Sequence, residues 1–239
     1  MAESTPSWIA QLDDGYFYSE WGWFCDRIGM EFGGLVYWYE LANEQNTVNH
    51  GSRDSIPIFN GCFTNLNNEE TGPYTQNYPD HTAFFRSIVN AFTGFTCFSC
   101  DLSYWLTNAG SSIDVIAMDH YPGSNLYTNK DWGAMDTLSS YAIQYNKLAG
   151  IMETGKATDA FCDEGCQSQW ILDNIRDGLR PKALAQNRDY YNNRYVLLAW
   201  YELYDDIGYG LIATDGHHKV AFSTFQSEAT NYVLPPYYS

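Results

Sequence analysis

Five apolar runs of strand length, separated by helical patterns, place the strongest constraint on the fold of this chain. We interpret them as strands at 35–44, 94–101, 113–121, 148–155 and 195–203. Helical spacing of apolar residues predicts helices at 19–33, 81–92, 103–110, 131–147, 168–187 and 218–231. Because parallel strands are buried on both faces, they are almost continuously apolar, and their crossover connections are usually helical. The pattern therefore predicts an α/β fold built from parallel βα units.

The number of these units predicts an incomplete barrel. A (β/α)8 barrel has eight strands and typically about 250 residues, whereas this chain of 239 residues offers five strands. The first 18 residues are too few for three further βα units. We expect one domain over 1–239 that lacks the first three units. A second chain that supplies these units, or an unusual open sheet, are the alternatives.

Composition limits the partners of the chain. The net charge of −17 repels nucleic acid and anionic membrane surfaces but not neutral ligands such as polysaccharides. No apolar run approaches the ~18 residues that a transmembrane helix needs. Aromatic residues make up 17% of the chain, which suits sugar-binding surfaces as well as ordinary core packing. We therefore expect a carbohydrate partner, and neither a nucleic acid nor a membrane.

Six cysteines bear on redox environment and on metal binding. Cys97 and Cys100 have the spacing of a zinc or redox motif, but they fall in an expected strand and no second pair matches them. We therefore predict no metal site. Cys162 and Cys166 enclose a short polar loop, for which we expect a local disulfide. The even count favours an extracellular or secreted protein, although no signal peptide is visible in the first residues.

A set of residues with polar groups lies at or close to the carboxyl ends of four of the expected strands. They are Asn43, Glu44, His120, Tyr121, Glu153 and Trp200. Because the carboxyl ends of parallel strands meet at one edge, active sites assemble there. Glu44 and Glu153 lie on strands three positions apart, which face each other across the mouth of a barrel. Two carboxyl groups about 5–5.5 Å apart are what a retaining glycosidase requires.

The segments that contain these residues resemble glycoside hydrolase clan A. They are ANEQN (42–46), DHYPGSN (119–125), IMETG (151–155) and LAWYELYDD (198–206), followed by GLIATDGHHKVAF (210–222). In that clan an Asn-Glu pair ends strand four, the nucleophilic Glu ends strand seven, and a Trp on strand eight forms the floor of the sugar site. The resemblance covers roughly residues 20–231. It implies a (β/α)8 TIM-barrel type of fold in which the five strands are strands four to eight.

The resemblance also implies roles for three of these residues. Glu44 would be the general acid/base, which first donates a proton and later deprotonates water. Glu153 would be the nucleophile that forms the glycosyl-enzyme intermediate. Asn43 would bind the sugar 2-hydroxyl. Without the resemblance, Glu44 could be a helix cap, and Glu153 could lie at the end of a strand with no catalytic role.

Three further residues are expected to contact the substrate or the nucleophile. Tyr121 would hold Glu153 through its hydroxyl group, His120 would contact the substrate, and Trp200 would stack under the sugar ring. A structural role for His120 and a core position for Trp200 are the alternatives. Among nearby acids, Glu202 is the main rival to either assigned carboxylate.

These residues together predict a retaining β-glycosidase that hydrolyses O-glycosidic bonds of a polysaccharide or oligosaccharide by double displacement. No metal or organic cofactor is called for. The alternatives are a non-catalytic carbohydrate-binding protein or inactive barrel fragment, a transglycosidase, and one part of a two-part enzyme. An unpaired edge strand, the fourth of the parent barrel, predicts self-association.

Overall fold

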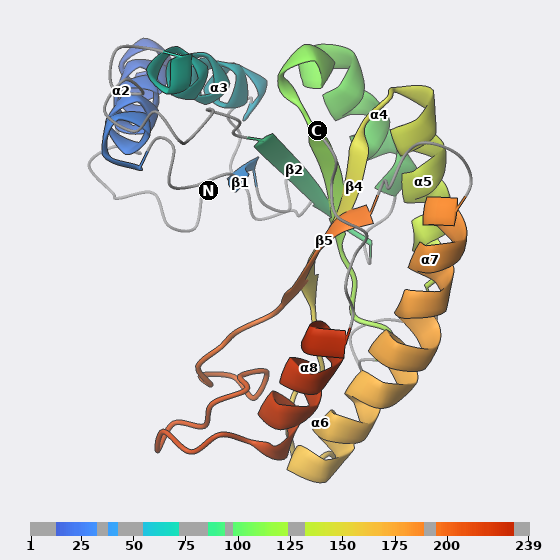
Figure 1. Ribbon diagram of the computed structural model, residues 1–239. Coiled ribbons are helices and arrows are strands. Elements are labelled where there is room, and N and C mark those ends of the chain that lie inside the picture. Colours follow the sequence, from blue (N-terminus) through green and yellow to red (C-terminus); the bar gives the residue numbers. More distant parts are fainter. Residues whose placement is uncertain are drawn as a thin grey trace. The chain divides into compact units, whose positions relative to one another are not determined.

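A computed structural model describes residues 13–32, 38–42, 55–71, 86–93, 98–123, 132–188 and 195–231 (Figure 1). By its internal contacts the chain divides into two compact units, Met1–Ala117 and Met118–Ser239. Five parallel strands follow one another in the order β1-β2-β3-β4-β5. They are β1 (Trp38–Ala42), β2 (Arg86–Phe92), β3 (Val115–Asp119), β4 (Leu148–Thr154) and β5 (Tyr195–Trp200). The expected α/β class with five parallel strands is confirmed.

In the first unit, two helices pack as a pair. Helix α2 (Asp14–Phe32) lies beside α3 (Ser55–Thr71) (Figure 1). The disulfide between Cys25 and Cys62 joins them, and Asn65 Nδ2 donates to the carbonyl oxygen of Gly22 at 2.6 Å. Strands β1 and β2 pair in parallel, with Trp38 opposite Arg86. Helix α4 (Phe98–Ala109) and the short η3 (Gly110–Ser112) precede β3.

Three expectations for this unit are wrong. Helix α3 lies within 45–80, where we predicted neither a helix nor a strand. The predicted helix at 81–92 contains β2, and the predicted strand at 94–101 contains the start of α4. In α3 the buried residues Ile56, Phe59 and Cys62 have helical spacing, which Asn and Gly obscure. Pro57 fits the first turn, where a backbone N–H has no intrahelical acceptor. The apolar run near β2 is short, and short runs do not distinguish a strand from a helix.

In the second unit, the predicted strands at 113–121, 148–155 and 195–203 are confirmed as β3, β4 and β5. The predicted helices at 131–147 and 218–231 are confirmed as α5 (Ala134–Gln144) and α8 (Val220–Asn231). The predicted helix at 168–187 is one continuous helical segment (Figure 1). It consists of α6 (Glu164–Trp170), the π-helical η4 (Ile171–Leu179) and α7 (Arg180–Arg188). The carboxylate of Asp163 caps it by accepting from Cys166 N at 2.8 Å.

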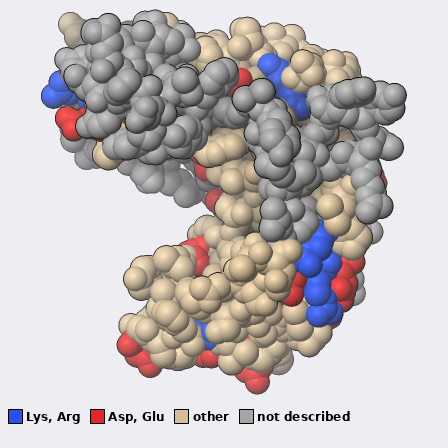
Figure 2. Space-filling view, in the orientation of Figure 1, with Lys and Arg blue, Asp and Glu red and all other residues tan. Residues whose placement is uncertain are grey.

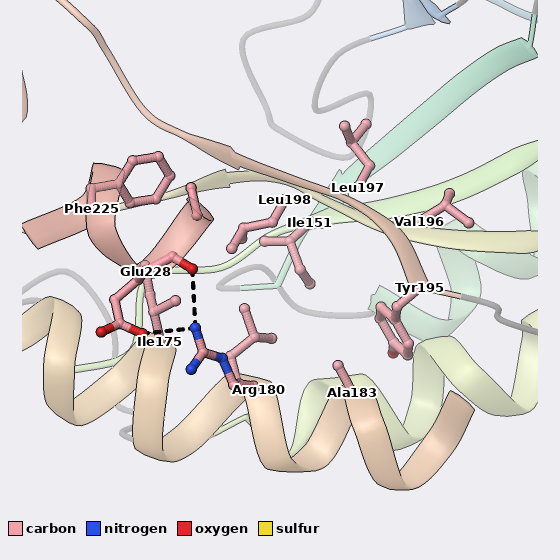
Figure 3. A pocket seen from close by; sticks show the side chains of 12 residues that line it. Ile151, Ile175, Arg180, Ala183, Tyr195, Val196, Leu197, Leu198, Phe225 and Glu228 are labelled. Carbon is pink, nitrogen blue, oxygen red and sulfur yellow. Dashed lines mark hydrogen bonds and ion pairs between the residues drawn. The ribbon is translucent and has the colours of Figure 1, made fainter. Parts of the chain in front are cut away.

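Burial of apolar residues explains why these strands could be recognised in the sequence. All five residues of β3 are buried, and Ile151 of β4 packs near Ile175 and Leu179 of η4 (Figure 3). On the surface, acidic and basic side chains lie next to each other over η4 and α7 (Figure 2). None of the described helices is long and apolar enough to cross a membrane.

The cysteines behave as disulfide residues in the described part of the chain. The expected bond between Cys162 and Cys166 is present, and Cys100 is also disulfide-bonded. Cys100 lies in α4 rather than in the strand that we expected, and Cys97 lies outside the described residues. Among the described residues, no group of His, Cys, Asp and Glu could hold a metal ion.

Candidate active site

An irregularity in β4 determines which way Glu153 points. Ile151 lies opposite Leu198 and Thr154 opposite Trp200, so three steps along β4 match two along β5. Regular alternation would place Glu153 on the same face as Ile151, which lines an apolar cavity toward η4 (Figure 3). A bulge adds one residue and turns the next side chain to another direction. The bulge in β4 therefore separates the Glu153 carboxyl from the apolar face.

The carboxyl of Glu153 is held by one strong hydrogen bond. Tyr121 donates its hydroxyl to Glu153 Oε2 at 2.6 Å, which is the contact expected from the sequence. Burial raises the pKa of Glu153, and the Tyr121 hydrogen bond acts in the opposite direction. Burial and the neighbouring carboxylate raise the pKa of Tyr121 as well, so its phenol stays protonated and donates.

Backbone hydrogen bonds extend the sheet past the regular strands at this point. His120 N donates to the Glu153 carbonyl at 2.9 Å, and Tyr201 N donates to the Thr154 carbonyl at 2.8 Å. The residues that follow β3, β4 and β5 are thereby fixed relative to one another. Side chains at these positions have little freedom to separate, which favours a preorganised site.

Three tyrosine rings surround this hydrogen bond. The centroids of Tyr121, Tyr201 and Tyr209 lie 5.5–6.0 Å apart, each pair in an edge-to-face arrangement. Burial, Glu202 and Glu153 raise the pKa of Tyr201 to about 12, and burial also raises that of Tyr209. Neither Tyr201 nor Tyr209 was among the predicted site residues. The signal for Tyr201 was its position directly after the β5 strand end.

Trp200 has its ring partners on two helices. Its indole packs edge-on against Trp170 of α6 at 5.8 Å and in a tilted arrangement against Phe225 of α8 at 5.5 Å. Its N–H donates to the Tyr209 carbonyl at 2.9 Å. The ring is half-buried, and its predicted role under a sugar ring stays a prediction.

His120 is enclosed by protein. Its side chain is 1% exposed, and its ring lies 5.1 Å from that of Trp132. This packing suits the structural alternative, because a ligand would have to displace protein atoms to reach the imidazole. A substrate contact by His120 stays a prediction.

Glu202, the rival carboxylate, lies directly after Tyr201 in an unusual conformation. Its φ is +68°, which is rare for a residue with a side chain and often marks a functional position. Its Oε2 is buried and has no hydrogen-bond partner among the described residues. Burial and the adjacent Asp206 carboxyl raise the pKa of Glu202. Two acids therefore stand near the tyrosine rings, with Glu153 the one that Tyr121 binds.

Two predicted site residues, Asn43 and Glu44, lie outside the described residues, so their roles stay predictions. The apolar cavity of about 310 Å³ between β4, β5, η4, α7 and α8 is a separate feature (Figure 3). Its charged groups are Arg180 and Glu228, which form an ion pair at 2.7 Å, and Glu153 does not line it.

Comparison with solved structures identifies the architecture. An endo-β-1,4-xylanase of glycoside hydrolase family 10 from Gloeophyllum trabeum matches with a TM-score of 0.56 and 11% identity, over 95% of this chain and 72% of the xylanase. The Penicillium canescens endo-1,4-β-xylanase XylE matches with a TM-score of 0.59 and 11% identity, over 96% and 72%. The CBM22-1–GH10 modules of Clostridium thermocellum Xyn10B, in complex with xylohexaose, give 0.61 and 13%, over 95% and 50%.

The chain has the fold of part of a family 10 xylanase barrel. The predicted TIM-barrel type of fold, present in part, is thereby confirmed. No protein-family model and no curated protein matches the sequence. At identities of 11–13%, the likeness shows the fold alone.

Proposed function

We propose that this chain is a retaining β-glycosidase with Glu153 as its nucleophile. The observation that carries the proposal is the 2.6 Å hydrogen bond from Tyr121 to Glu153 at the carboxyl end of a barrel strand. That end of a barrel is where catalytic residues assemble. A carboxylate with one firm donor keeps an oxygen free for attack on an anomeric carbon.

The reaction follows from the two carboxyl groups. A Glu153 oxygen bonds to the anomeric carbon while the bond to the leaving oxygen breaks, and Glu44 gives that oxygen a proton. Water, deprotonated by Glu44, then attacks the same carbon and releases Glu153. Attachment of the sugar removes the negative charge of Glu153, which lowers the pKa of Glu44 and suits its change from acid to base. Asn43 and Trp200 would bind the sugar.

Xylo-oligosaccharides are the first substrates to test. Related folds include a xylanase complexed with xylohexaose and a variant enzyme complexed with xylotriose. The surplus of acidic residues in this chain suits neutral sugars rather than polyanions. The disulfides Cys25–Cys62 and Cys162–Cys166 support a secreted protein, because such bonds persist in oxidising compartments.

The test is hydrolysis of aryl β-xylosides and xylo-oligosaccharides by the wild-type chain and by single variants. Glu153→Gln and Glu44→Gln should each lower kcat/KM by at least about a thousandfold. Glu31→Gln, at an exposed glutamate of α2, is the matched control and should retain full activity. Turnover that survives both site substitutions would show that the proposed pair is wrong.

Chemical rescue separates the two roles. With Glu153→Gly, added azide should restore turnover and give the α-glycosyl azide, because azide attacks where the nucleophile stood. With Glu44→Ala, azide should attack the intermediate and give the β-glycosyl azide. Sugar binding without turnover by the wild type would favour the non-catalytic alternative. Transfer to added sugar acceptors in place of hydrolysis would favour a transglycosidase.

A further inference from the structure

The segment that follows β5 is fastened to the rest of the second unit by buried polar side chains. The Gly208 carbonyl accepts from Thr158 N at 2.9 Å, from Thr158 Oγ1 at 3.1 Å and from Lys219 Nζ at 3.2 Å. The Gln167 amide donates to the Lys156 carbonyl at 2.7 Å and makes longer contacts with the carbonyls of Gly208 and Tyr209. We call Thr158, Gln167 and Lys219 the carbonyl clamp.

Two residues of the carbonyl clamp are almost inaccessible to water, and Thr158 is partly exposed. Gln167 is fully buried and Lys219 is 3% exposed, and Lys219 forms an ion pair with Asp205 at 2.6 Å. Burying an amide or an ammonium group is costly unless its hydrogen bonds are satisfied. The segment 205–210 is therefore held in one arrangement, because any displacement would leave buried donors without acceptors.

This arrangement fixes the backbone of Tyr209 and, with it, the direction of the Tyr209 ring. The Tyr209 carbonyl also accepts from Trp200 Nε1 at 2.9 Å. A Cβ atom on Gly155 would lie 3.1 Å from Tyr209 Cδ1, so the ring covers the backbone two residues after Glu153. An alanine at position 155 would require the ring to move by a few tenths of an ångström.

The same ring supports the partner of Glu153. Tyr209 packs edge-on against Tyr121 at 5.6 Å, and Tyr121 donates its hydroxyl to Glu153. We propose that Tyr209 is a positioning residue: held through its backbone by the carbonyl clamp, its ring keeps Tyr121 on Glu153 and keeps water away from that carboxyl. The catalytic role of Tyr209 rests on the proposed function, whereas its packing against Tyr121 does not.

The consequence is measurable as the pH at which Glu153 ionises. Tyr121, Asp119 and Tyr201 are the titratable groups that act on Glu153 or on its hydrogen-bond donor. Glu202, Asp206 and Asp159 act on the two tyrosines, Tyr201 and Tyr209, that pack against Tyr121. Among the causes that act on Glu153, burial is the largest and raises its pKa. Removal of the Tyr209 ring admits water, which lowers the midpoint, and loosens the Tyr121 hydrogen bond, which raises it. Because burial is the larger of the two causes, we expect the net shift to be downward.

The experiment is a pH titration by carbon-13 NMR of the unliganded protein labelled at the Glu carboxyl carbons. The Glu153→Gln variant assigns the Glu153 signal. We expect Tyr209→Ala to lower the Glu153 midpoint by roughly half a pH unit or more, whereas Tyr209→Phe leaves it unchanged because the ring stays. Gln167→Leu should shift it in the same direction as Tyr209→Ala. Tyr204→Ala, at an exposed ring of the same segment, is the control and should cause no shift.

Melting curves check that each variant folds. If Tyr209→Ala does not fold, Gly155→Ala offers a smaller displacement of the same ring and should give a smaller downward shift. An unchanged or raised Glu153 midpoint in folded Tyr209→Ala, or in folded Gly155→Ala where it takes the place of Tyr209→Ala, overturns the proposal. Because the titration needs no substrate, it succeeds or fails independently of whether the chain hydrolyses glycosides. If hydrolysis is found, the acidic limb of the pH profile of kcat/KM should move with the midpoint.

Discussion

Burial and a hydrogen bond have opposing effects on the ionisation of Glu153. Burial disfavours its charged form, and the Tyr121 hydroxyl favours that form. Burial is the larger influence, so the folded protein binds a proton on Glu153 more tightly than the unfolded chain does. Ionised Glu153 is therefore a cost to folding, which is typical of residues kept for chemistry rather than for stability.

We predict that Glu153→Gln raises thermal stability at neutral pH. A carboxyl whose pKa is raised in the folded state loses stability as pH rises from its unfolded-state pKa through its folded-state pKa. The neutral amide avoids that loss and still accepts from Tyr121. The gain should be of order 1 kcal/mol, or roughly 2–4 °C in a domain of this size.

Melting curves of wild type and variant between pH 3.5 and 8 provide the check for Glu153→Gln. The difference in Tm should vanish below about pH 4, where the glutamate is neutral in both folded and unfolded states. A gain that is constant over the whole range would instead come from packing. A loss at pH 7 would contradict the prediction.

At the site, the sequence revealed the residues that lie at strand ends and missed those that a loop brings in. Glu153 and Tyr121 follow apolar strands, so their place at one edge could be predicted from pattern alone. Tyr209 reaches the same place because Gly208, with a φ of +97°, lets the segment turn and because buried side chains hold it. Contacts of that kind depend on long-range packing, which local patterns do not encode.

At the scale of elements, the length of an apolar run decided what could be predicted. Strands β3, β4 and β5 were visible because they are long apolar runs with helices around them. Strand β2 was mistaken for a helix because apolar residues at 84, 85, 88, 89 and 92 also fit helical spacing. Helix α4 was missed at its start, although Leu102, Trp105, Leu106 and Ala109 are buried at helical intervals.

The pairing of α2 with α3 offers a prediction at this scale. The Cys25–Cys62 bond spans 37 residues and the Cys162–Cys166 bond spans 4. If disulfides act by restricting the unfolded chain, loss of the first should cost about 4 kcal/mol and loss of the second about 2 kcal/mol. Double Cys→Ala variants of each pair, unfolded in urea, give the two values, and each pair is the control for the other. Equal losses would contradict the prediction.

For the whole chain, the position of β1 in the sheet and the net charge have opposite effects on self-association. Strand β1 stands at one end of the order β1-β2-β3-β4-β5 and carries Trp38, which is 36% exposed. A strand at the end of a sheet that carries an apolar side chain is a place where another copy of the chain can pair. The net charge of −17 opposes such association, because copies of the chain repel one another. Ionic strength should therefore control the oligomeric state.

We predict that the chain is monomeric in dilute buffer and associates as salt is added. The Debye length falls from about 10 Å at 0.1 M to about 3 Å at 1 M, so repulsion between copies is screened while backbone pairing is not. Sedimentation velocity at several salt concentrations measures the shift from monomer to oligomer.

Trp38→Lys should abolish the shift from monomer to oligomer, because a charged edge residue blocks pairing. Phe32→Lys adds the same charge at an exposed ring of α2 and should leave the shift in place. A chain that stays monomeric at every salt concentration, or that loses association equally in both variants, would show that β1 is not the contact.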